Sequence, residues 1–426
     1  MHKIERLLQT LAPKGVEFKT LEEVFEIKNG YTPSKNNPEF WEKGTIPWFR
    51  MEDIRENGRI LKDSIQHITP KALKGKKLFP KNSIIISTTA TIGEHALLIV
   101  ESLANQRFTF LSKKANCDIA LDMKFFFYQC FLLGEWCKKN TNVSGFASVD
   151  MTAFKKYKFP IPPLEIQQEI VKILDAFTEL NTELNTELKA RKKQYEYYQN
   201  MLLDFNDINQ SHKDAKEKLA QKPYPKRLKT LLQTLAPKGV GFRKLGEVIN
   251  ILKGKQLNKE LLLDYGKYPV MNGGIHASGY WNEYNTDYPK IIISQGGASA
   301  GYVNYMTSKF WAGAHCYTIE LNSEKLNYKF LYYFLKNSQT ILMKSQFGAG
   351  IPALNKADIE TLTIPIPPLE IQQEIVKILD QFSILTTDLL AGIPAEIKAR
   401  KKQYEYYREK LLTFKPITPH KEVKKC

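Results

Sequence analysis

Three loops in the first half of the sequence carry side chains that can hydrogen-bond to the edges of nucleic-acid bases. GYTPSKNNPEFW at 30–41 is rich in turn-forming residues, and STTATIG at 87–93 presents small hydroxyls that allow another backbone to approach closely. In ANQRFTF at 104–110, Gln106 is suited to adenine and Arg107 to guanine, each through two hydrogen bonds. The candidate contacts are Tyr31, Thr32, Ser34, Lys35, Asn36, Thr88, Thr89, Gln106 and Arg107.

The second half offers a comparable set in different loops. MNGGIHASGYWN at 271–282 is a polar turn, SQGGASAGYVN at 294–304 combines a glutamine with glycines that expose main-chain N–H groups, and AHCYTIE at 314–320 supplies a histidine. Each candidate in either half has a plainer alternative, as a turn former or as a polar group satisfied within the protein. The candidates here are Lys255, Gln256, Asn272, His276, Ser278, Gln295, Ser299 and His315.

No catalytic centre is apparent in the sequence. It has no GxxxxGK[ST] loop for nucleotide hydrolysis and no glycine-rich cofactor signature, and NPEF at 37–40 only approximates the [ND]PP[FYW] motif of amino-methyltransferases. The seven histidines form no HExxH pattern, and the five cysteines form no CxxC pair. We therefore predict a chain without catalytic residues, without a metal site and without a cofactor of its own.

The composition is typical of a globular protein with a basic surface. Of the 426 residues, 43% are hydrophobic and 25% are charged, and 62 Lys and Arg against 45 Asp and Glu leave a net charge of +17. This excess favours binding to a polyanion such as nucleic acid, although a generally basic proteome would give the same value. Because the sequence has no apolar run long enough for a membrane span and no secretory signal, we expect a cytoplasmic protein.

The elements that must position these loops are repeated along the chain. Three motifs occur twice in the same order, namely LLQTLAPKGV at 7–16 and 231–240, PIPPLEIQQEIVKILD at 160–175 and 365–380, and KARKKQYEYY at 189–198 and 398–407. Between the first and second motif lie two variable regions, residues 17–159 and 241–364, that differ in sequence. The offset between copies falls from 224 to 205, so the second variable region is shorter by 224 − 205 = 19 residues. One duplicated frame therefore carries two unlike inserts.

A long helix follows the second motif in each half. Pro162 and Pro163 suit a helix start, whereas Gly392 and Pro394 predict a break in the second helix, which restarts through Glu396. We expect two antiparallel helices, the first about 60 Å long; the alternative is that each helix packs on its own domain. Apolar residues alternate four and three apart, as in a coiled-coil seam, at Ile166, Ile170, Ile173, Phe177, Leu180 and Leu184, and at Ile371, Ile375, Ile378, Phe382, Leu385 and Leu389.

These patterns predict an α+β protein with a pseudo-twofold internal repeat. Each variable region contains a β-branched run, at 83–87 and 290–294, and one amphipathic helix, at 123–138 and 328–344. We predict two mixed α/β domains separated by two long antiparallel helices that form a coiled-coil spacer. The expected boundaries are 1–163 for the first domain, 164–205 for the first helix, 206–230 for a linker, 231–367 for the second domain, 368–414 for the second helix and 415–426 for a basic tail.

The duplicated frame with two unlike inserts resembles the specificity subunit of type I restriction–modification systems. The resemblance rests on the paired motifs, on GTIPWFRMEDI at 44–54 and on SQGGASAGYVN followed by FWAGAHC at 310–316, and it covers essentially the whole chain. It implies two target recognition domains, each reading one half of a split double-stranded DNA sequence in the major groove.

The resemblance also implies partners. Two modification subunits, which hold S-adenosylmethionine and methylate adenine, would dock on the helices. Restriction subunits, which use ATP and magnesium, would join through them, and the chain itself would be non-catalytic. Tyrosines on the repeated helices either anchor a partner or cover the intramolecular helix pair. The docking candidates are Gln167, Gln168, Tyr195, Tyr198, Gln372, Gln373, Tyr404 and Tyr407.

The two helical regions differ in one respect. The first contains TELNTELNTEL at 178–188, and the resemblance implies that such short repeats set the gap between the two half-sites. Other interpretations of the whole chain remain open. They are a stand-alone two-headed DNA-binding protein, the specificity part of another restriction class, and a two-lobed protein scaffold, which the basic charge disfavours.

Overall fold

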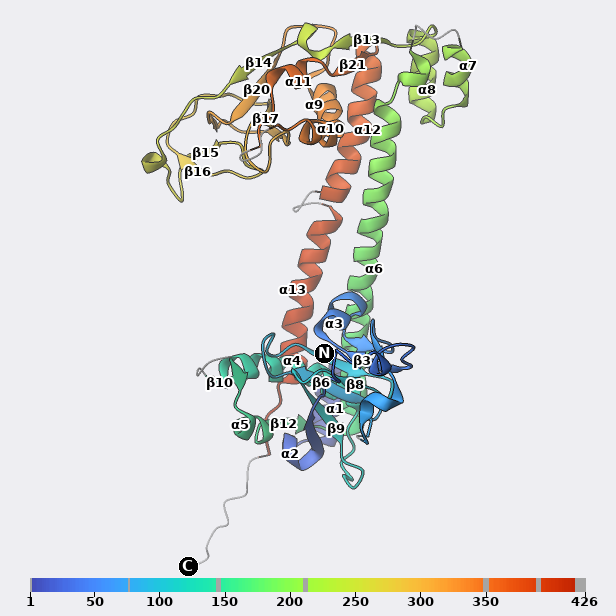
Figure 1. The fold of residues 1–426 in the computed structure, drawn as a ribbon, viewed down its shortest axis with the longest axis vertical. Coiled ribbons are helices and arrows are strands. Elements are labelled where there is room, and N and C mark those ends of the chain that lie inside the picture. Colours follow the sequence, from blue (N-terminus) through green and yellow to red (C-terminus); the bar gives the residue numbers. More distant parts are fainter. Residues whose placement is uncertain are drawn as a thin grey trace, which may run out of the picture. The chain divides into compact units, whose positions relative to one another are not determined.

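The computed structural model describes residues 2–75, 77–142, 147–209, 214–347, 352–387 and 392–417 (Figure 1). It forms two compact units: unit 1 contains Met1–Glu183 and Lys398–Cys426, and unit 2 contains Leu184–Ile397. Most of the predicted basic tail, residues 418–426, lies outside the described residues. Among the described helices, none combines the length and the apolar character that crossing a membrane requires.

A five-stranded sheet forms the centre of unit 1. Its strands, in spatial order, are β2 (Phe25–Asn29), β9 (Phe108–Lys113), β6 (Ser83–Ser87), β7 (His95–Leu98) and β4 (Ile60–Leu61). The isoleucines of β6 are fully buried, because Ile84 and Ile86 face one hydrophobic cluster and Ile85 faces another. A smaller sheet has the order β5 (His67–Ile68), β3 (Ile46–Phe49) and β8 (Leu103–Ala104), in which β3 and β8 are parallel.

Unit 2 repeats this arrangement with one strand fewer. Its larger sheet has the order β14 (Ile249–Lys253), β20 (Cys316–Leu321), β17 (Lys290–Ser294) and β18 (Val303–Met306). Its smaller sheet has the order β16 (Gly279–Trp281), β15 (Tyr268–Met271) and β19 (Trp311–Ala312), with β15 and β19 parallel. Residues 50–82, which include α3 (Met51–Asn57) and β4, correspond to residues 272–289, and this difference of 33 − 18 = 15 accounts for most of the 19 residues. The mixed α/β prediction is confirmed.

One helical region accompanies the larger sheet in each unit. In unit 1 it is α4 (Met123–Lys139), capped by the Asp122 side chain, and its Cys130 and Cys137 are buried in the core. In unit 2 the predicted single helix is two, α9 (Tyr328–Asn337) and α10 (Gln339–Lys344), with Ser338 between them. The remaining short elements are α2 (Leu21–Val24), β10 (Thr141–Asn142), β11 (Ser148–Val149), α5 (Met151–Lys155), α7 (Ala215–Gln221) and α11 (Lys356–Glu360).

Further elements join each variable region to the frame. A pair of strands closes the region, β1 (Glu17–Thr20) with β12 (Lys158–Ile161) and β13 (Gly241–Lys244) with β21 (Thr363–Ile366). The first repeated motif forms the ends of α1 (His2–Leu11) and α8 (Lys226–Leu235). The segment predicted as a linker, residues 206–230, contains α7 and the start of α8, and its Leu219 and Leu228 are buried in the core of unit 2.

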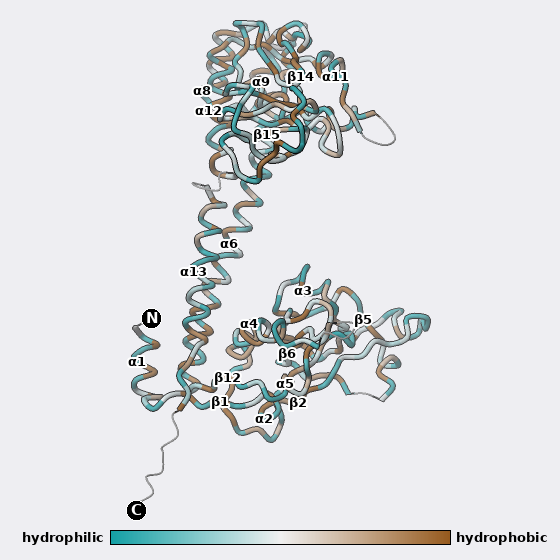
Figure 2. The backbone as a smooth tube through the Cα atoms, turned by 90° about the vertical axis from the view of Figure 1, so that its left-hand side faces the viewer, coloured by the Kyte–Doolittle hydropathy of each residue, from teal (hydrophilic) through white to brown (hydrophobic). Residues whose placement is uncertain are grey.

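The outer ends of the long helical regions lie within two residues of the predicted ends, and the second region is divided into two helices. The helices are α6 (Leu164–Leu203), α12 (Leu369–Thr387) and α13 (Ile393–Leu412). Pro394 lies in the first turn of α13, where its missing N–H is not needed, so the predicted restart after Gly392 is confirmed. Hydrophobic and hydrophilic stretches alternate along α6 and α13 (Figure 2).

The first turns of α6 and α12 bury a different face from the predicted seam. The fully buried apolar residues in the first turns of α6 are Ile166, Ile170 and Leu174, whereas Ile173 is only half-buried. They are four residues apart because they pack on the globular core of unit 1, which follows the straight helical period and not the 3.5-residue seam. The matching residues of α12 are Ile371, Ile375 and Leu379. The alternative packing, of each helix on its own domain, thus holds for these turns.

A buried histidine in β7 makes the stability of unit 1 depend on pH. His95 is 2% exposed, and its Nδ1 lies 3.2 Å from the carbonyl oxygen of Gly93. Burial, together with the charges of Arg59 and Arg408, lowers the pKa of His95 to about 3. In the unfolded chain the imidazole takes up a proton near pH 6.5, whereas in the folded chain it stays neutral down to about pH 3. The contribution of neutral His95 to the stability of unit 1 is therefore complete above pH 6.5 and is lost as the pH falls toward 3.

We expect His95→Val to remove this pH dependence, because valine has no group that titrates. Valine is chosen because Val303 holds the corresponding position in β18 of unit 2. Below pH 6 the wild-type chain should lose about 1 kcal/mol of unit 1 stability per pH unit relative to the variant. Hydrogen exchange of unit 1 peptides at several pH values measures this, with unit 2 peptides of the same chain as the control. Equal pH slopes for the two proteins would contradict it.

Candidate nucleic-acid interface and repeated surfaces

Five segments of unit 1 meet through main-chain hydrogen bonds at the ends of β3, β6 and β8. They are the turn after β2, the end of β3, the end of β6, the loop between β8 and β9, and β11. The bonds run from Gly30 N to Phe108 O (2.9 Å), Tyr31 N to Ala104 O (2.7 Å), Asn105 N to Phe49 O (3.0 Å), Thr88 N to Arg107 O (3.1 Å) and Val149 N to Thr88 O (2.9 Å). We call this arrangement the first cradle.

Unit 2 builds the same arrangement from an unlike sequence. The corresponding bonds run from Gly254 N to Cys316 O (2.9 Å), Lys255 N to Ala312 O (2.8 Å), Gly313 N to Met271 O (2.8 Å), Gln295 N to His315 O (2.8 Å) and Leu354 N to Gln295 O (2.8 Å). We call it the second cradle. Each bond joins the same pair of elements as its counterpart in unit 1, so the two cradles correspond residue by residue.

Each cradle requires a glycine at its closest approach. A Cβ on Gly30 would lie 2.2 Å from the carbonyl oxygen of Asn105, and a Cβ on Gly254 would lie 2.1 Å from that of Gly313. Both distances are far below van der Waals contact with main-chain atoms, which cannot rotate away. Any side chain at either position would therefore push the turn and the loop apart.

A tryptophan braces each cradle from a different strand. The indole N–H of Trp48 in β3 donates to the carbonyl oxygen of Tyr31 (2.9 Å), and that of Trp311 in β19 donates to the carbonyl oxygen of Lys255 (3.1 Å). Sequence reasoning missed both roles. The signal was the single tryptophan in GTIPWFR and in FWAGAHC, but its partner is 17 residues away in one case and 56 in the other.

The first cradle brings several predicted residues together. The hydroxyl of Thr32 donates to the side-chain oxygen of Gln106, and Arg107 beside it is exposed and has no ion pair within the described part of the chain. Thr88 requires a correction, because it is 6% exposed and its hydroxyl lies 2.9 Å from that of Thr109, so we remove it from the candidates. The others are exposed or half-buried, namely Tyr31, Ser34, Lys35, Asn36 and Thr89.

The second cradle brings together Asn272, Gln295 and His315. The side-chain oxygen of Asn272 accepts the backbone N–H of exposed His315 (3.2 Å), and the side-chain oxygen of Gln295 is buried without a partner among the described residues. No group of three His, Cys, Asp or Glu residues placed to hold a metal ion occurs in the described ranges. The other candidates lie nearby on the chain and are exposed or half-buried, namely Lys255, Gln256, His276, Ser278 and Ser299.

Two of the predicted docking residues are internal in the structure. Gln167 is completely buried: its side-chain oxygen accepts the N–H of Asp122 (2.8 Å), and its nitrogen donates to the carbonyls of Ala120 (2.9 Å) and Pro162 (2.7 Å). Gln372 does the same in unit 2 with Asn327 (2.7 Å), Lys325 (2.8 Å) and Pro367 (2.7 Å). Both predictions are wrong, because the amide is needed to join the variable region to the helix.

An aspartate later in the same motif makes a second repeated junction. Asp175 accepts hydrogen bonds from Lys124 Nζ (2.6 Å) and from the hydroxyl of Tyr128 (2.6 Å) on α4. Asp380 accepts from Lys329 Nζ (2.8 Å) and from the hydroxyl of Tyr333 on α9. Burial and the adjacent carboxylate raise the pKa of both tyrosines above the usual value. Much of the sixteen-residue repeat is thus used within the chain.

The four predicted tyrosines close the helix pair inside each unit. In unit 1 the Phe177 ring of α6 lies 6.1 Å from that of Tyr404 and 5.7 Å from that of Tyr407. In unit 2 the Phe382 ring lies 6.4 Å from Tyr195 and 5.2 Å from Tyr198. All four tyrosines are half-buried by these contacts. The alternative reading, that they cover the intramolecular helix pair, is the one that these contacts support.

Other repeated residues remain exposed in both units. Leu11 and Leu235 are 42% and 41% exposed, and Leu164 and Leu369 are 37% and 38% exposed. The exposed fractions match within each pair, although exposure of a large apolar side chain to water does not stabilise the protein. We call these residues, with the others that are repeated and exposed, the repeated surface; its further members are Gln168, Lys172 and Tyr406 in unit 1, and Gln373, Lys377 and Tyr197 in unit 2.

In unit 2 the repeated leucines line a groove of about 510 Å³. Leu235 and Ala236 come from the first motif, and Pro367, Pro368 and Leu369 come from the second, so the two motifs meet at this groove. In both units a salt bridge joins the helix that ends in the first motif, α1 or α8, to the second motif, between Lys3 and Glu169 (2.6 Å) and between Arg227 and Glu374 (3.1 Å).

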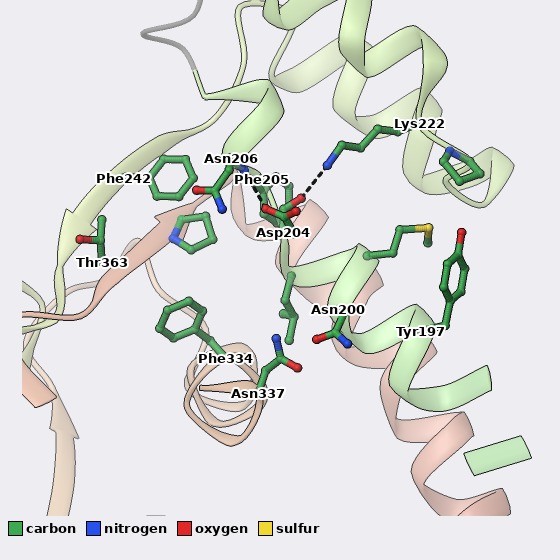
Figure 3. Close-up of a pocket in the computed structure, with 14 residues that line it drawn as sticks. Tyr197, Asn200, Asp204, Phe205, Asn206, Lys222, Phe242, Phe334, Asn337 and Thr363 are labelled. Carbon is green, nitrogen blue, oxygen red and sulfur yellow. Dashed lines mark hydrogen bonds between the residues drawn. The ribbon is translucent and has the colours of Figure 1, made fainter. Parts of the chain in front are cut away.

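A second cavity, of about 610 Å³, lies beside the end of α6 in unit 2 (Figure 3). Phe242 of β13 and Phe334 of α9 line it, and exposed Tyr197 of the repeated surface stands at its edge. Lys222 donates to the carbonyl oxygen of Asp204 (3.1 Å) at the same cavity. The repeated surface of unit 2 therefore also borders a cavity of mixed polar and apolar lining beside α6.

Comparison with known proteins identifies this architecture. The family model described as "Type I restriction modification DNA specificity domain" matches residues 13–193 and 237–399, once over each half. The chain belongs to this family. The type I restriction enzyme EcoprrI specificity subunit of Escherichia coli is 40% identical over 91% of this chain and 93% of its own length, and the MjaIX specificity subunit of Methanocaldococcus jannaschii is 26% identical over 85% of each.

Solved structures of type I systems share the fold. The S subunit of M. genitalium superposes with a TM-score of 0.57 at 19% identity, over 93% of this chain and 96% of that one. A chain from a study of complex assembly and conformational transition in the type I restriction–modification system gives 0.57 at 18%, over 94% and 98%. The sequence-based assignment to type I specificity subunits is confirmed.

Proposed function

We propose that each variable region reads one half of a bipartite double-stranded DNA target and that the chain catalyses no reaction itself. The observation that carries this proposal is the pair of cradles, which present unlike polar side chains from the same main-chain arrangement. A net charge of +17 supports a nucleic-acid partner. The domain limits 1–163 and 231–367, and a cytoplasmic location, belong to this proposal.

We infer that two copies of one modification subunit dock on the two repeated surfaces. Apolar residues that are identical and more than one third exposed in both units are what two copies of the same partner would need. S-adenosylmethionine would be bound by those subunits, and ATP and magnesium by restriction subunits joined through them. A gel shift with and without the modification subunit tests whether tight DNA binding requires that subunit. Tight, specific binding by the chain alone would favour a stand-alone DNA-binding protein.

Deleting one TELN unit from α6 is expected to shorten the unread gap in the target by one or two base pairs. The segment is continuous helix, in which Thr178 and Thr182 donate to the carbonyls of Leu174 and Thr178 (both 2.9 Å). Four helical residues span about 6 Å, against about 3.4 Å for one base pair. Mapping methylated adenines in cells that carry the deletion measures the gap. An unchanged gap would show that these repeats do not set it.

A further inference from the structure

We propose that Arg50 is a specificity-determining residue of the first variable region, and that Arg50 with Asn272, and Arg107 with His315, contact corresponding base pairs of the two half-sites. This inference rests on the proposed function, since it requires that the variable regions read DNA. It states in addition which positions of the two unlike sequences are equivalent. It also includes Arg50, which is absent from the candidate contacts predicted from the sequence.

Arg107 and His315 occupy the same place in the two cradles. Each carbonyl accepts the N–H of the residue that follows β6 or β17, Thr88 in one unit and Gln295 in the other. Each backbone N–H donates to an asparagine side-chain oxygen: Arg107 to Asn105 (3.0 Å), and His315 to Asn272 (3.2 Å). Both side chains are exposed. The loops thus present a guanidinium and an imidazole from one fixed main-chain position.

Arg50 and Asn272 are likewise equivalent. Each follows the last residue of the strand whose carbonyl holds the cradle loop, Phe49 in β3 and Met271 in β15. Asn272 also occupies the space of the missing side chain at Gly313, because a Cβ there would lie 2.4 Å from its Oδ1. With that oxygen already accepting from His315, the Asn272 nitrogen remains as a donor toward a base edge.

The Arg50 side chain is available for a contact outside the chain. The side chain is 31% exposed, and its ion pair with Glu52 is long, with 3.9 Å between Nε and the carboxylate; Nε itself is buried and has no hydrogen-bond partner in the described structure. Its guanidinium carbon lies 5.9 Å from the ring centre of Trp48, which braces the cradle. A partly exposed guanidinium with only a long ion pair can turn its terminal N–H groups toward a ligand.

The main-chain hydrogen bond at Arg50 does not depend on its side chain. Asp53 accepts the backbone N–H of residue 50 (2.6 Å), and this bond is kept by any residue other than proline. Arg50→Gln therefore removes the guanidinium and leaves the main-chain junction intact. Arg50→Lys keeps the charge but loses the two parallel donors that select guanine. The matched control is Arg55→Gln, because Arg55 is an exposed arginine of α3, the short helix that begins after Arg50.

The test is genome-wide mapping of adenine methylation in cells carrying the complete system with a restriction-deficient partner. Arg50→Gln and Arg107→Gln should each relax one position of the first half-site, with discrimination reduced about tenfold to a hundredfold. Asn272→Leu and His315→Leu should each relax one position of the second half-site. Counted from the unread gap, the position relaxed at Arg50 should match that at Asn272, and the position at Arg107 should match that at His315. Arg55→Gln should leave the motif unchanged.

The inference is overturned if Arg50→Gln leaves the motif unchanged, if it relaxes the second half-site, or if paired residues relax different positions. If Arg50→Gln abolishes methylation, Arg50→Lys must show the relaxed position; if it too abolishes methylation, Arg50 is structural and the inference fails. Failure of the proposed function is distinguishable, because the wild-type system itself would then show no two-part motif.

Discussion

Gln372→Leu is expected to lower the free energy of unfolding of unit 2 by about 3–5 kcal/mol, since each buried group left unpaired costs about 1–3 kcal/mol. The side chain is fully buried and makes three hydrogen bonds, to Asn327 N, Lys325 O and Pro367 O. Leucine has a similar volume but leaves all three main-chain groups without a partner. Hydrogen exchange of peptides from residues 184–397 reports the loss, with unit 1 peptides as the internal reference.

The next residue provides the control. Gln373 has the same chemistry in the same motif but is exposed, so Gln373→Leu should change the stability by less than about 0.5 kcal/mol. Gln167→Leu and Gln168→Leu should give the same contrast in unit 1. Equal effects within either pair would show that the buried amide does not hold the variable region on the helix.

Leu235→Glu is expected to remove one of two bound modification subunits, and Leu11→Glu together with Leu235→Glu should remove both. The glutamate replaces an exposed apolar side chain of the repeated surface by a charge, and the loss of a buried apolar contact at an interface is worth about 2 kcal/mol or more, roughly a thirtyfold loss in affinity. Native mass spectrometry of the assembled complex counts the copies. Each single variant should retain one partner, because the other repeated surface is untouched.

An exposed isoleucine outside the repeats separates docking from general surface effects. Ile341 on α10 is 57% exposed and has no repeated counterpart, so Ile341→Glu should leave two partners bound. Two partners on the double leucine variant would mean that the repeated leucines do not dock them. Loss of both partners from either single variant would point to one shared surface in place of two.

The sequence predicted the parts of this fold that repeat or that have a strong local pattern. The isoleucine runs of β6 and β17 are buried strands, and α13 does begin directly after Gly392, with Pro394 in its first turn. The exact repeat also misled, because identity at Gln167 and Gln372 indicated a shared surface when it records a shared internal junction. Identical sequence reports an identical environment, and only burial distinguishes the inside from the outside.

The candidate interface was predictable only in part. Gln106, Arg107, Gln295 and His315 lie in polar loops, and the structure places them on the cradles. Arg50 was missed because it lies between an apolar strand and a charged helix, outside the turn-rich polar loops from which the candidates were taken. Its position emerges from long-range main-chain bonds, which a linear pattern does not contain.

The most direct test of this account is to exchange residues 241–364 for the corresponding segment of another family member and to map the methylated motif. The graft ends within the paired strands β13 and β21, whose register joins Gly241 to Ile366 and Lys244 to Thr363, so the frame is retained. We predict that one half of the two-part motif is replaced while the other half and the gap stay the same. A change in both halves, or in neither, would contradict the assignment of one half-site to each variable region.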